Sequence, residues 1–390
     1  MFQLIGETSF PFMKYRAFGY ISSGLFVLCG IGAMVWHAMQ HGTFLNFGID
    51  FAGGTTVQMK FISAPPVDEL RARLEEAGLK DVSLQRFGSV EANEIMVRVA
   101  QQTEQQHNIS EQIRDAIYTL EERQQLASGR IDLNNAGRAE IAAKLAESAG
   151  GGEDSDAAEA YRGVADAVVT YRTSHDGLIG GYEEVAGLDG VTPQVLELLK
   201  SRSLLGHFTV LGVESVGPAV GKDLKDKAIG AIISAMAGLL IYIWFRFQLR
   251  FGIAAVVCLV HDVIVTVGAI ALTNREVNLP VVAALLTIVG YSLNDTIVIF
   301  DRIRDNLRLM RKESFPALID ASINQTLSRT ILTSLTVLVV VLALFFFGGP
   351  TINGFAFALL VGVIAGSYST IFVASAFLLD TSRGSRPRAS

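Results

Sequence analysis

Six apolar segments constrain the fold of this chain more than any other feature. Half of its 390 residues are hydrophobic and only 18% are charged, a balance that is unusual for a soluble domain. A transmembrane helix needs about 20 mainly apolar residues to cross the hydrocarbon core of a bilayer. The sequence therefore predicts an all-α six-helix transmembrane bundle, with spans at residues 17–39, 228–247, 251–273, 279–300, 330–348 and 354–379.

The first span follows two basic residues, Lys14 and Arg16, and no convincing small-residue cleavage site lies near Met39. A removed signal peptide would need such a site. We therefore expect residues 17–39 to remain as a membrane anchor, with a cleaved signal peptide as the alternative.

Basic residues near the span ends predict the orientation of the bundle, because lysine and arginine are enriched on the cytoplasmic side. If the six spans alternate, one side holds nearly all of these residues, and the opposite short loops hold only Arg275. Residues 1–16 and 380–390 are thus predicted to be cytoplasmic, and residues 40–227 extracytoplasmic. The basic residues on the predicted cytoplasmic side are Lys14, Arg16, Arg246, Arg250, Arg302, Arg304, Arg308, Arg311, Lys312, Arg329, Arg383, Arg386 and Arg388.

The large segment between the first two spans is acidic. Residues 41–227 contain 29 acidic and 18 basic residues, which argues against nucleic acid as a partner because phosphate binding needs positive charge. Both cysteines, Cys29 and Cys258, lie in predicted spans, so this segment has no disulfide framework. No cluster of metal-ligand residues is evident, and we expect neither a metal nor a cofactor.

The pattern of this segment predicts an α+β (ferredoxin-like) domain at 40–227. Residues 43–61 alternate apolar and polar side chains around Gly53 and Gly54, which is typical of a β-hairpin. A helix, two strands, a second helix and a last strand before the second span follow. This order favours an antiparallel sheet with helices on one face.

Residues 130–200 interrupt that pattern with Ala-rich helical sequence on either side of a Gly-rich acidic linker at 149–156. We interpret them as an inserted helical subdomain. The stretches "IDLNNAGRAEI" and "VAGLDGVTPQVLELL" faintly resemble helix-hairpin-helix repeats, which often bind DNA. Because this copy is acidic and predicted to be extracytoplasmic, a protein contact or a spacer is the favoured interpretation.

Polar residues inside the spans are the candidate functional groups. The third span contains His261 and Asp262, and the fourth contains Asn294 and Asp295. Each ionisable residue in a bilayer costs on the order of 2.5–3.5 kcal/mol by insertion scales and usually faces a bundle interior or a cavity. Packing alone explains His261 about as well as function does, whereas it explains Asp295 poorly.

Arg329 precedes the fifth span and shares a helical face with Thr333 and Thr336. Consecutive helices are often neighbours, so this face is a plausible partner for Asp295. Burial favours the neutral form of a carboxyl and a nearby guanidinium favours the charged form. We therefore hypothesise that Asp295 changes charge as Arg329 moves. Alternatively, Arg329 only anchors the helix in the membrane, with its side chain extended so that the guanidinium reaches the membrane–water interface.

Several motifs together resemble those of the SecF proteins, which belong to the SecD/SecF family of the resistance-nodulation-division superfamily. They are "FGIDFAGGT" after the first span, "ESVGPAVG" before the second, "HD" in the third, "GYSLNDTIVIFDRIRDNLR" in the fourth and "NQTLSRTILTS" at the head of the fifth. The resemblance implies a multi-pass protein of the cell inner membrane. It also implies that the chain pairs with SecD in a twelve-span unit and uses the proton motive force to promote export of unfolded preproteins.

The same resemblance implies partners and site residues. SecA and SecYEG would begin translocation, and a YajC-like subunit would accompany the complex. The proton-pathway aspartate and arginine of the family fall on Asp295 and Arg329, and its signature loop falls on Gly48, Asp50, Gly53 and Gly54, to which we assign a structural role. Whether the coupling ion is H+ or Na+ stays open. The 130–200 insertion makes the domain larger than is usual in the family.

Two other classes of function compete with this interpretation. One is a proton-driven exporter of small molecules or lipids from the same superfamily, but such exporters usually carry twelve spans and two outer loops in one chain. The other is an intramembrane hydrolase, and here HExxH, Gly-x-Gly-Asp and Walker A motifs are all absent from the sequence. We therefore expect that the chain is not an enzyme.

Overall fold

The computed structural model describes residues 8–79, 82–87, 90–100, 109–147, 156–246 and 249–382. The chain forms two compact units, which we describe separately. The helical unit comprises Met1–Phe51 and Lys222–Ser390, and the sheet unit comprises Ala52–Gly221. Two predicted features lie outside the described residues. They are the linker at 149–156, of which only Asp156 is described, and the basic residues of the tail.

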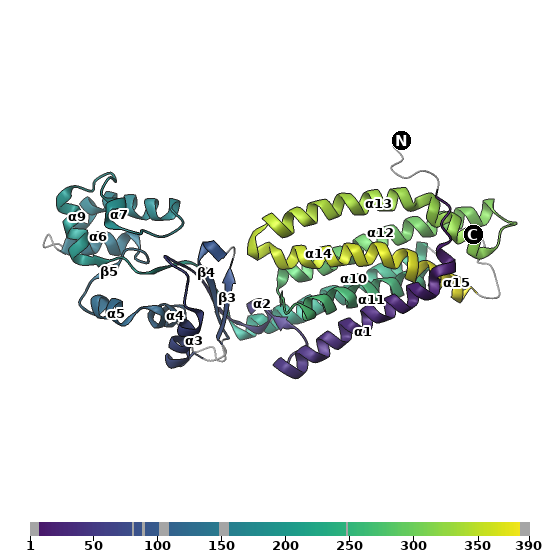
Figure 1. Cartoon of the computed structure of the whole chain (residues 1–390), viewed down its shortest axis with the longest axis horizontal. Helices are drawn as coiled ribbons and strands as arrows, with labels where there is room; N and C mark the ends of the chain where they lie inside the picture. The colour runs from purple at the N-terminus through teal and green to yellow at the C-terminus, as the bar shows by residue number, and fades with distance from the viewer. Residues whose placement is uncertain are drawn as a thin grey trace. The chain divides into compact units, whose positions relative to one another are not determined.

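Long helices dominate the helical unit (Figure 1). Among the described residues, six helices are long and apolar enough to cross a membrane, which confirms the predicted number of spans. A short 3-10 helix, η1, leads into the first, and a π-helical turn, η3, interrupts the last. The elements are η1 (Phe12–Tyr15), α1 (Arg16–His41), α10 (Pro218–Arg246), α11 (Leu249–Leu272), α12 (Leu279–Leu309), α13 (Phe315–Phe347), α14 (Gly349–Ser369), η3 (Thr370–Ala374) and α15 (Ser375–Thr381).

Helices α12 and α13 are longer than the apolar runs that predicted them at 279–300 and 330–348. Asn278 caps α12 by accepting a hydrogen bond from the backbone N–H of Val281, and Ser314 caps α13 in the same way through Ala317. Both helices also begin with a proline in the first turn, where its missing N–H costs nothing. The added residues are 301–309 at the end of α12 and 315–329 at the start of α13. Hydropathy detects only the apolar part of each helix, so the prediction missed these more polar ends.

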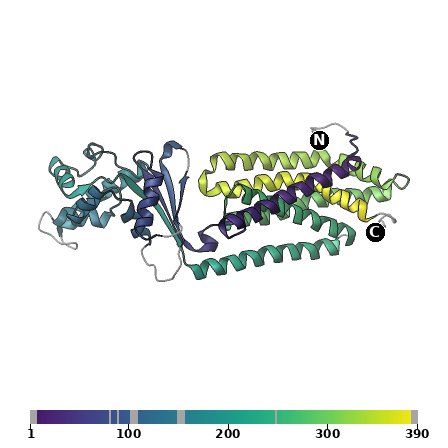
Figure 2. The same ribbon diagram turned by 60° about the horizontal axis from the view of Figure 1, so that its bottom comes forward.

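Helices α11, α12 and α14 form the buried centre of the helical unit, whereas α10 and α13 are largely exposed. In Figure 2, the teal α10 runs apart from the other helices. Helix α1 packs closely on α11, since a Cβ on Gly268 would meet the Cα of Gly30. Such backbone contact through small residues is a common way for membrane helices to associate.

The sheet unit contains a small antiparallel sheet with the strand order β3-β4-β2-β7. Helices α3 and α4 bury their apolar faces against it, in a core that includes Met59, Leu74, Ile95, Ile113 and Phe208. The observed strands and helices confirm a predominantly helical protein with a small sheet region. The elements are β2 (Gly54–Phe61), α3 (Val67–Glu76), β3 (Val82–Phe87), η2 (Val90–Ala92), β4 (Glu94–Val99), α4 (Ile109–Ile117) and β7 (Phe208–Val216).

The hairpin predicted at residues 43–61 is wrong. The short strand β1 (Asn46–Phe47) pairs in parallel with β8 (Glu276–Val277), and α2 (Ile49–Ala52) separates it from β2. The two glycines do not close a hairpin. Gly53 has a φ of 73° and Gly54 a φ of 135°, and a Cβ on Gly53 would lie 3.0 Å from the Cα of Pro218. Glycine is therefore required here to redirect the chain.

Helical segments fill most of the predicted insertion. Their core is formed by buried apolar residues that include Leu133, Ile141, Val168, Ile179 and Leu199. A two-stranded parallel sheet, β5 with β6, brings the two ends of this region together. The elements are α5 (Leu120–Ala127), β5 (Ile131–Asp132), α6 (Arg138–Glu147), α7 (Asp156–Ser174), α8 (Tyr182–Val185), α9 (Pro193–Arg202) and β6 (Ser203–Leu204).

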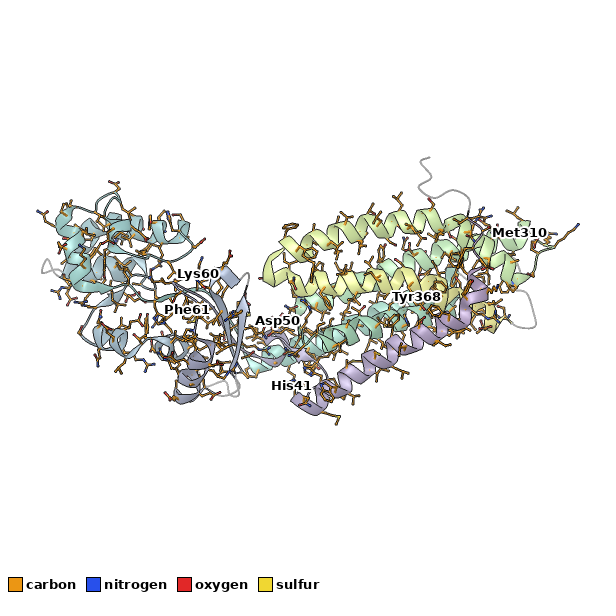
Figure 3. The ribbon with its side chains drawn as sticks, in the orientation of Figure 1. His41, Asp50, Lys60, Phe61, Met310 and Tyr368 are labelled. Atoms are coloured by element: carbon orange, nitrogen blue, oxygen red, sulfur yellow. The ribbon has the colours of Figure 1, made fainter. Side chains whose placement is uncertain are left out.

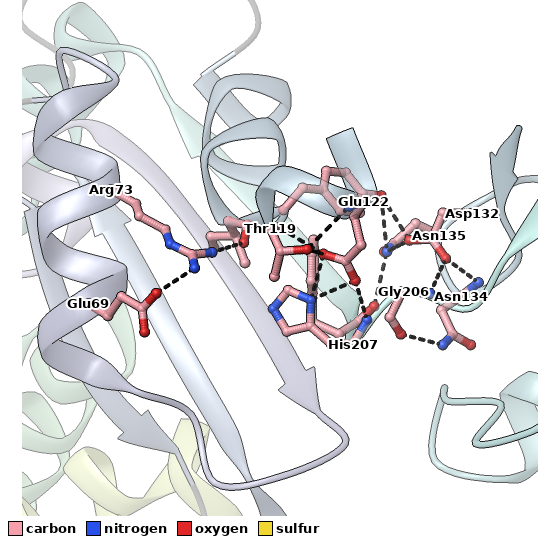
Figure 4. Close-up of polar contacts among 12 residues, drawn as sticks. Glu69, Arg73, Thr119, Glu122, Asp132, Asn134, Asn135, Gly206 and His207 are labelled. Atoms are coloured by element: carbon pink, nitrogen blue, oxygen red, sulfur yellow. Dashed lines mark hydrogen bonds and ion pairs between the residues drawn. The ribbon is translucent and has the colours of Figure 1, made fainter. Parts of the chain in front are cut away.

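A buried carboxylate joins this helical region to the sheet (Figure 4). Asp132 is 4% exposed and accepts hydrogen bonds from the backbone of Asn134 and Gly206, from Tyr118 Oη and from Asn135 Nδ2. Asn135 in turn donates to the carbonyl of Phe208 on β7 at 3.1 Å. The insertion is therefore anchored to the sheet through satisfied polar contacts.

Glu122 makes a second polar contact beside that anchor (Figure 4). Thr119 and Glu122 form a capping box at the start of α5. The backbone N–H and the Nδ1 atom of His207 lie 2.9 Å and 2.8 Å from Glu122 Oε1. The carboxyl group thus holds the residue that precedes β7.

We expect the substitution Asp132→Ala to destabilise the sheet unit by about 3 kcal/mol, because it leaves several buried donors without an acceptor. Pulse proteolysis of the full-length protein in urea would measure this change. Asp166→Ala serves as a control, since its carboxyl is 56% exposed in an ion pair with Arg138 and should change stability by less than about 0.5 kcal/mol. Equal effects of the two substitutions would contradict this prediction.

The stability of the sheet unit should fall between about pH 4.5 and pH 2 because of Glu122. Burial opposes its ionisation, but hydrogen bonds from His207 and the backbone of Thr119 outweigh burial and lower the pKa of Glu122 to about 2. Because the folded pKa lies below the unfolded one, this stabilisation is present above the unfolded value and is lost as the pH falls through the folded value. Pepsin susceptibility across this range should become less pH-dependent in Glu122→Gln, whereas Glu121→Gln, at an exposed neighbour, should behave like the wild type.

Candidate functional site

Asp295 is buried in the middle of α12 and is incompletely paired. Its side chain is 3% exposed, and its Oδ2 atom has no hydrogen-bond partner among the described residues. Arg329, its predicted partner, lies on α13. Arg329 itself is exposed on this chain. The pairing of Asp295 with Arg329 therefore stays a prediction.

Hydroxyl groups of three helices form a chain of hydrogen bonds that begins one turn before Asp295. Tyr291 lies one turn before Asp295, and its hydroxyl donates to Ser334 of α13 at 3.1 Å. Ser334 contacts Ser367 of α14 at 2.8 Å. The predicted hydroxyl stripe on α13 is used differently, because Thr333 donates to the backbone carbonyl of its own helix at Arg329. We call Asp295, Arg329, Tyr291, Ser334 and Ser367 the Asp295 cluster.

A second buried cluster contains His261 and Asp262 of α11. Asp262 is 1% exposed. Its carboxylate lies 2.9 Å from His261 Nδ1, and it accepts hydrogen bonds from Ser292 of α12 at 2.5 Å and from Ser369 of α14 at 2.9 Å. Cys258 donates to Ser369 at 3.0 Å. We call Cys258, His261, Asp262, Ser292 and Ser369 the Asp262 cluster.

Helix α12 contributes to both clusters. Ser292 belongs to the Asp262 cluster, whereas Tyr291 and Asp295 belong to the Asp295 cluster. Asn294, which the sequence placed with Asp295, is exposed at the surface of this chain. Of the five predicted pathway residues, His261, Asp262 and Asp295 are therefore buried, whereas Asn294 and Arg329 are exposed on this chain.

The π-helical turn at Thr370–Ala374 lies next to the Asp262 cluster. Thr370 contacts Thr296 of α12 at 3.1 Å, and Ser375 donates to the carbonyl of Thr370 at 3.0 Å. Turns of this type are rare and frequently occur at functional sites. No periodicity in the sequence signals the turn.

The signature loop fixes the start of α12. Asp50 (labelled in Figure 3) accepts a hydrogen bond from a backbone N–H of α12. The donor is Leu279, the first residue of that helix, at 2.9 Å. The backbone N–H of Gly48 donates to Val277 at 2.8 Å, and a Cβ there would lie 3.3 Å from the Cβ of Asn278. The loop thereby positions the helix that carries Asp295.

Within the described residues, no group of three or more His, Cys, Asp or Glu side chains could hold a metal ion.

Two family descriptions match the chain. "Protein export membrane protein SecD/SecF, C-terminal" matches residues 198–384, which include both clusters. "SecD/SecF GG Motif" matches residues 45–61, which include the signature loop. This is a family of protein-export membrane proteins and not of enzymes.

Similar proteins cover nearly the whole chain. A protein translocase subunit SecF from Koribacter versatilis is 40% identical and is matched over 97% of this chain and 93% of its own length. SecF from Vibrio alginolyticus is 33% identical, with coverage of 97% and 92%. The crystal structure of SecDF, a translocon-associated membrane protein from Thermus thermophilus, is similar with a TM-score of 0.64 and 29% identity. That match covers 96% of this chain but only 39% of the longer SecDF chain. The chain therefore belongs to the SecD/SecF family of protein export membrane proteins.

Proposed function

We propose that this chain is an accessory subunit of the Sec preprotein translocase that pairs with SecD and uses the proton motive force to promote protein export across the cell inner membrane. Two observations support the pairing. Curated relatives of similar length are named SecF, and the match to SecDF leaves well over half of that chain uncovered. A SecD-type partner would supply the missing spans.

The wider assembly follows from the proposed pairing. SecA and SecYEG would start translocation, a YajC-like subunit would accompany the pair, and the substrate would be an unfolded preprotein. The distribution of lysine and arginine supports cytoplasmic termini and a periplasmic sheet unit. The order β-α-β-β-α-β of the main elements, with the sheet order β3-β4-β2-β7, supports a ferredoxin-like fold for that unit. The insertion would serve as a contact surface or spacer.

Asp295 is the proposed coupling residue, and its unpartnered buried oxygen is the observation that carries this proposal. An ionised carboxyl in a low-dielectric medium needs a partner of opposite charge, and Arg329 on α13, which packs against α12, is the proposed partner. Protonation of Asp295 would remove this attraction and release α13 from α12. Loss of the proton would restore the attraction.

This exchange can do work only if protons enter and leave on opposite sides of the membrane. A proton that crosses the full potential supplies roughly 2.3 kcal/mol per 100 mV. If the two states of the bundle hold the sheet unit differently, and if those two positions bind an extended polypeptide with different affinity, repeated cycles move the polypeptide in one direction. The free edge of the sheet could bind such a polypeptide as an added strand.

The substitution Asp295→Asn should abolish the part of preprotein export that depends on the membrane potential and leave the part driven by SecA and ATP intact. Asparagine has nearly the same shape but cannot ionise. The measurement is translocation into inverted membrane vesicles that contain the co-expressed partner, with and without a proton gradient. Replacing the proton gradient by a sodium gradient identifies the coupling ion.

Asp305→Asn is the matched control, because this residue lies on the same helix but is exposed. It should export preproteins like the wild type. Undiminished potential-dependent export by Asp295→Asn would contradict the proposal. Purification of the chain as a homotrimer without a six-span partner would instead favour a small-molecule or lipid exporter.

A further inference from the structure

His261 is buried with only one of its two ring nitrogens paired. The side chain is 6% exposed. Its Nδ1 atom lies 2.9 Å from Asp262 Oδ1, whereas its Nε2 atom has no hydrogen-bond partner among the described residues. A histidine kept only for packing would have both ring nitrogens satisfied, because buried polar groups are almost always hydrogen-bonded. The unpaired nitrogen therefore calls for another role.

The contacts of Asp262 determine which nitrogen of His261 carries the hydrogen. Its carboxylate also accepts hydrogen bonds from Ser292 on α12 and Ser369 on α14. Both serines donate to its Oδ2 atom, whereas its Oδ1 atom faces Nδ1 of His261. An ionised carboxylate can only accept hydrogen bonds. Nδ1 of His261 is then the donor to Asp262. In a neutral imidazole the other nitrogen must be an acceptor, so Nε2 presents a free lone pair.

We propose that Nε2 of His261 is a second proton-binding site of the helical unit, backed by the fixed carboxylate of Asp262. When a proton arrives, an N–H bond forms at Nε2, the ring becomes an imidazolium, and the Nδ1–H bond to Asp262 is retained. When the proton leaves, the ring returns to the neutral form. The buried positive charge is balanced by Asp262, which already lies at hydrogen-bond distance.

This site differs in kind from Asp295. Binding of a proton neutralises Asp295, whereas at His261 it creates a cation beside an anion that does not change. Ser292 joins the two, because it donates to Asp262 and lies three residues before Asp295 on α12. A change of charge at His261 is thus transmitted to the helix that carries the proposed coupling residue. The role in coupling rests on the proposed function, but the binding of a proton does not.

Among the described residues, the contacts found for this part of the Asp262 cluster are mostly with uncharged groups. The titratable side chains among them are Asp262 and Cys258 of α11 and Tyr368 of α14 (labelled in Figure 3). The ring centroids of Tyr368 and His261 lie 6.5 Å apart. Tyr368 donates to the carbonyl of Gly19 in α1 at 2.8 Å. Helix α12 contributes the hydroxyl groups of Ser292 and Thr296. The imidazole therefore has one anionic partner, and α1 covers the tyrosine beside it.

Solid-state NMR of the histidine nitrogens in the full complex, reconstituted in lipid bilayers, tests the site directly. His261→Asn assigns the signal by its disappearance. We expect the Nε2 resonance of His261 to change from that of a bare nitrogen to that of a protonated one as the pH is lowered, while Nδ1 stays protonated throughout. An Nε2 resonance that does not change over the whole range in which the complex stays folded would overturn the proposal.

The same substitution separates proton binding from a merely structural role. Asparagine places its amide near the position of Nδ1, so His261→Asn keeps a donor for Asp262 but removes the Nε2 site. We expect this variant to assemble with its partner and to lose one titrating step from the pH profile of proton flux. A profile identical to the wild type, together with normal assembly, would show that His261 serves only to hold Asp262.

The NMR result and the export measurement fail independently. If Asp295→Asn keeps its potential-dependent export while the His261 resonance still titrates, the proposed function is wrong and the second proton site stands. If the export measurement succeeds and the resonance does not change, only the second site is lost.

Discussion

The cost of placing a carboxylate in an apolar medium governs the interior of the helical unit. Two aspartates meet this cost in opposite ways. Asp262 has hydrogen-bond partners on α11, α12 and α14, so its charge holds three helices together. Asp295 has a buried oxygen with no hydrogen-bond partner among the described residues, and Arg329 of α13 is its proposed counter-charge. The first arrangement suits a fixed charge, and the second suits a charge that changes.

Small residues make these contacts possible. A Cβ on Gly362 of α14 would meet Ile288 of α12, and one on Gly366 would lie 3.2 Å from the Cβ of Ser292. The close approach of α14 to α12 brings Ser369 within reach of the carboxylate on α11. A side chain at either glycine would require its neighbours on α12 to shift. Packing and chemistry are therefore determined by the same residues.

The sequence predicted the six spans and the two intramembrane aspartates, because length and polarity are local properties. It could not predict the partners of Asp262, since Ser369 lies 107 positions away and serine is unremarkable in a membrane helix. The hairpin at residues 43–61 failed because alternating side chains do not reveal that β1 pairs with β8 rather than with β2. The orientation of Asn294 likewise depends on how α12 is rotated in the bundle, which composition alone does not specify.

The way in which the chain passes between its two units has a mechanical consequence. It crosses once just before β2 and once just after β7, and these two strands are direct neighbours that pair from Gly54 with Val216 to Phe61 with Phe208. Both covalent connections therefore leave the sheet from the same end of one strand pair. A load applied to the insertion, which is anchored to β7 through Asn135, would accordingly be borne by the same strand pair from which both connections leave.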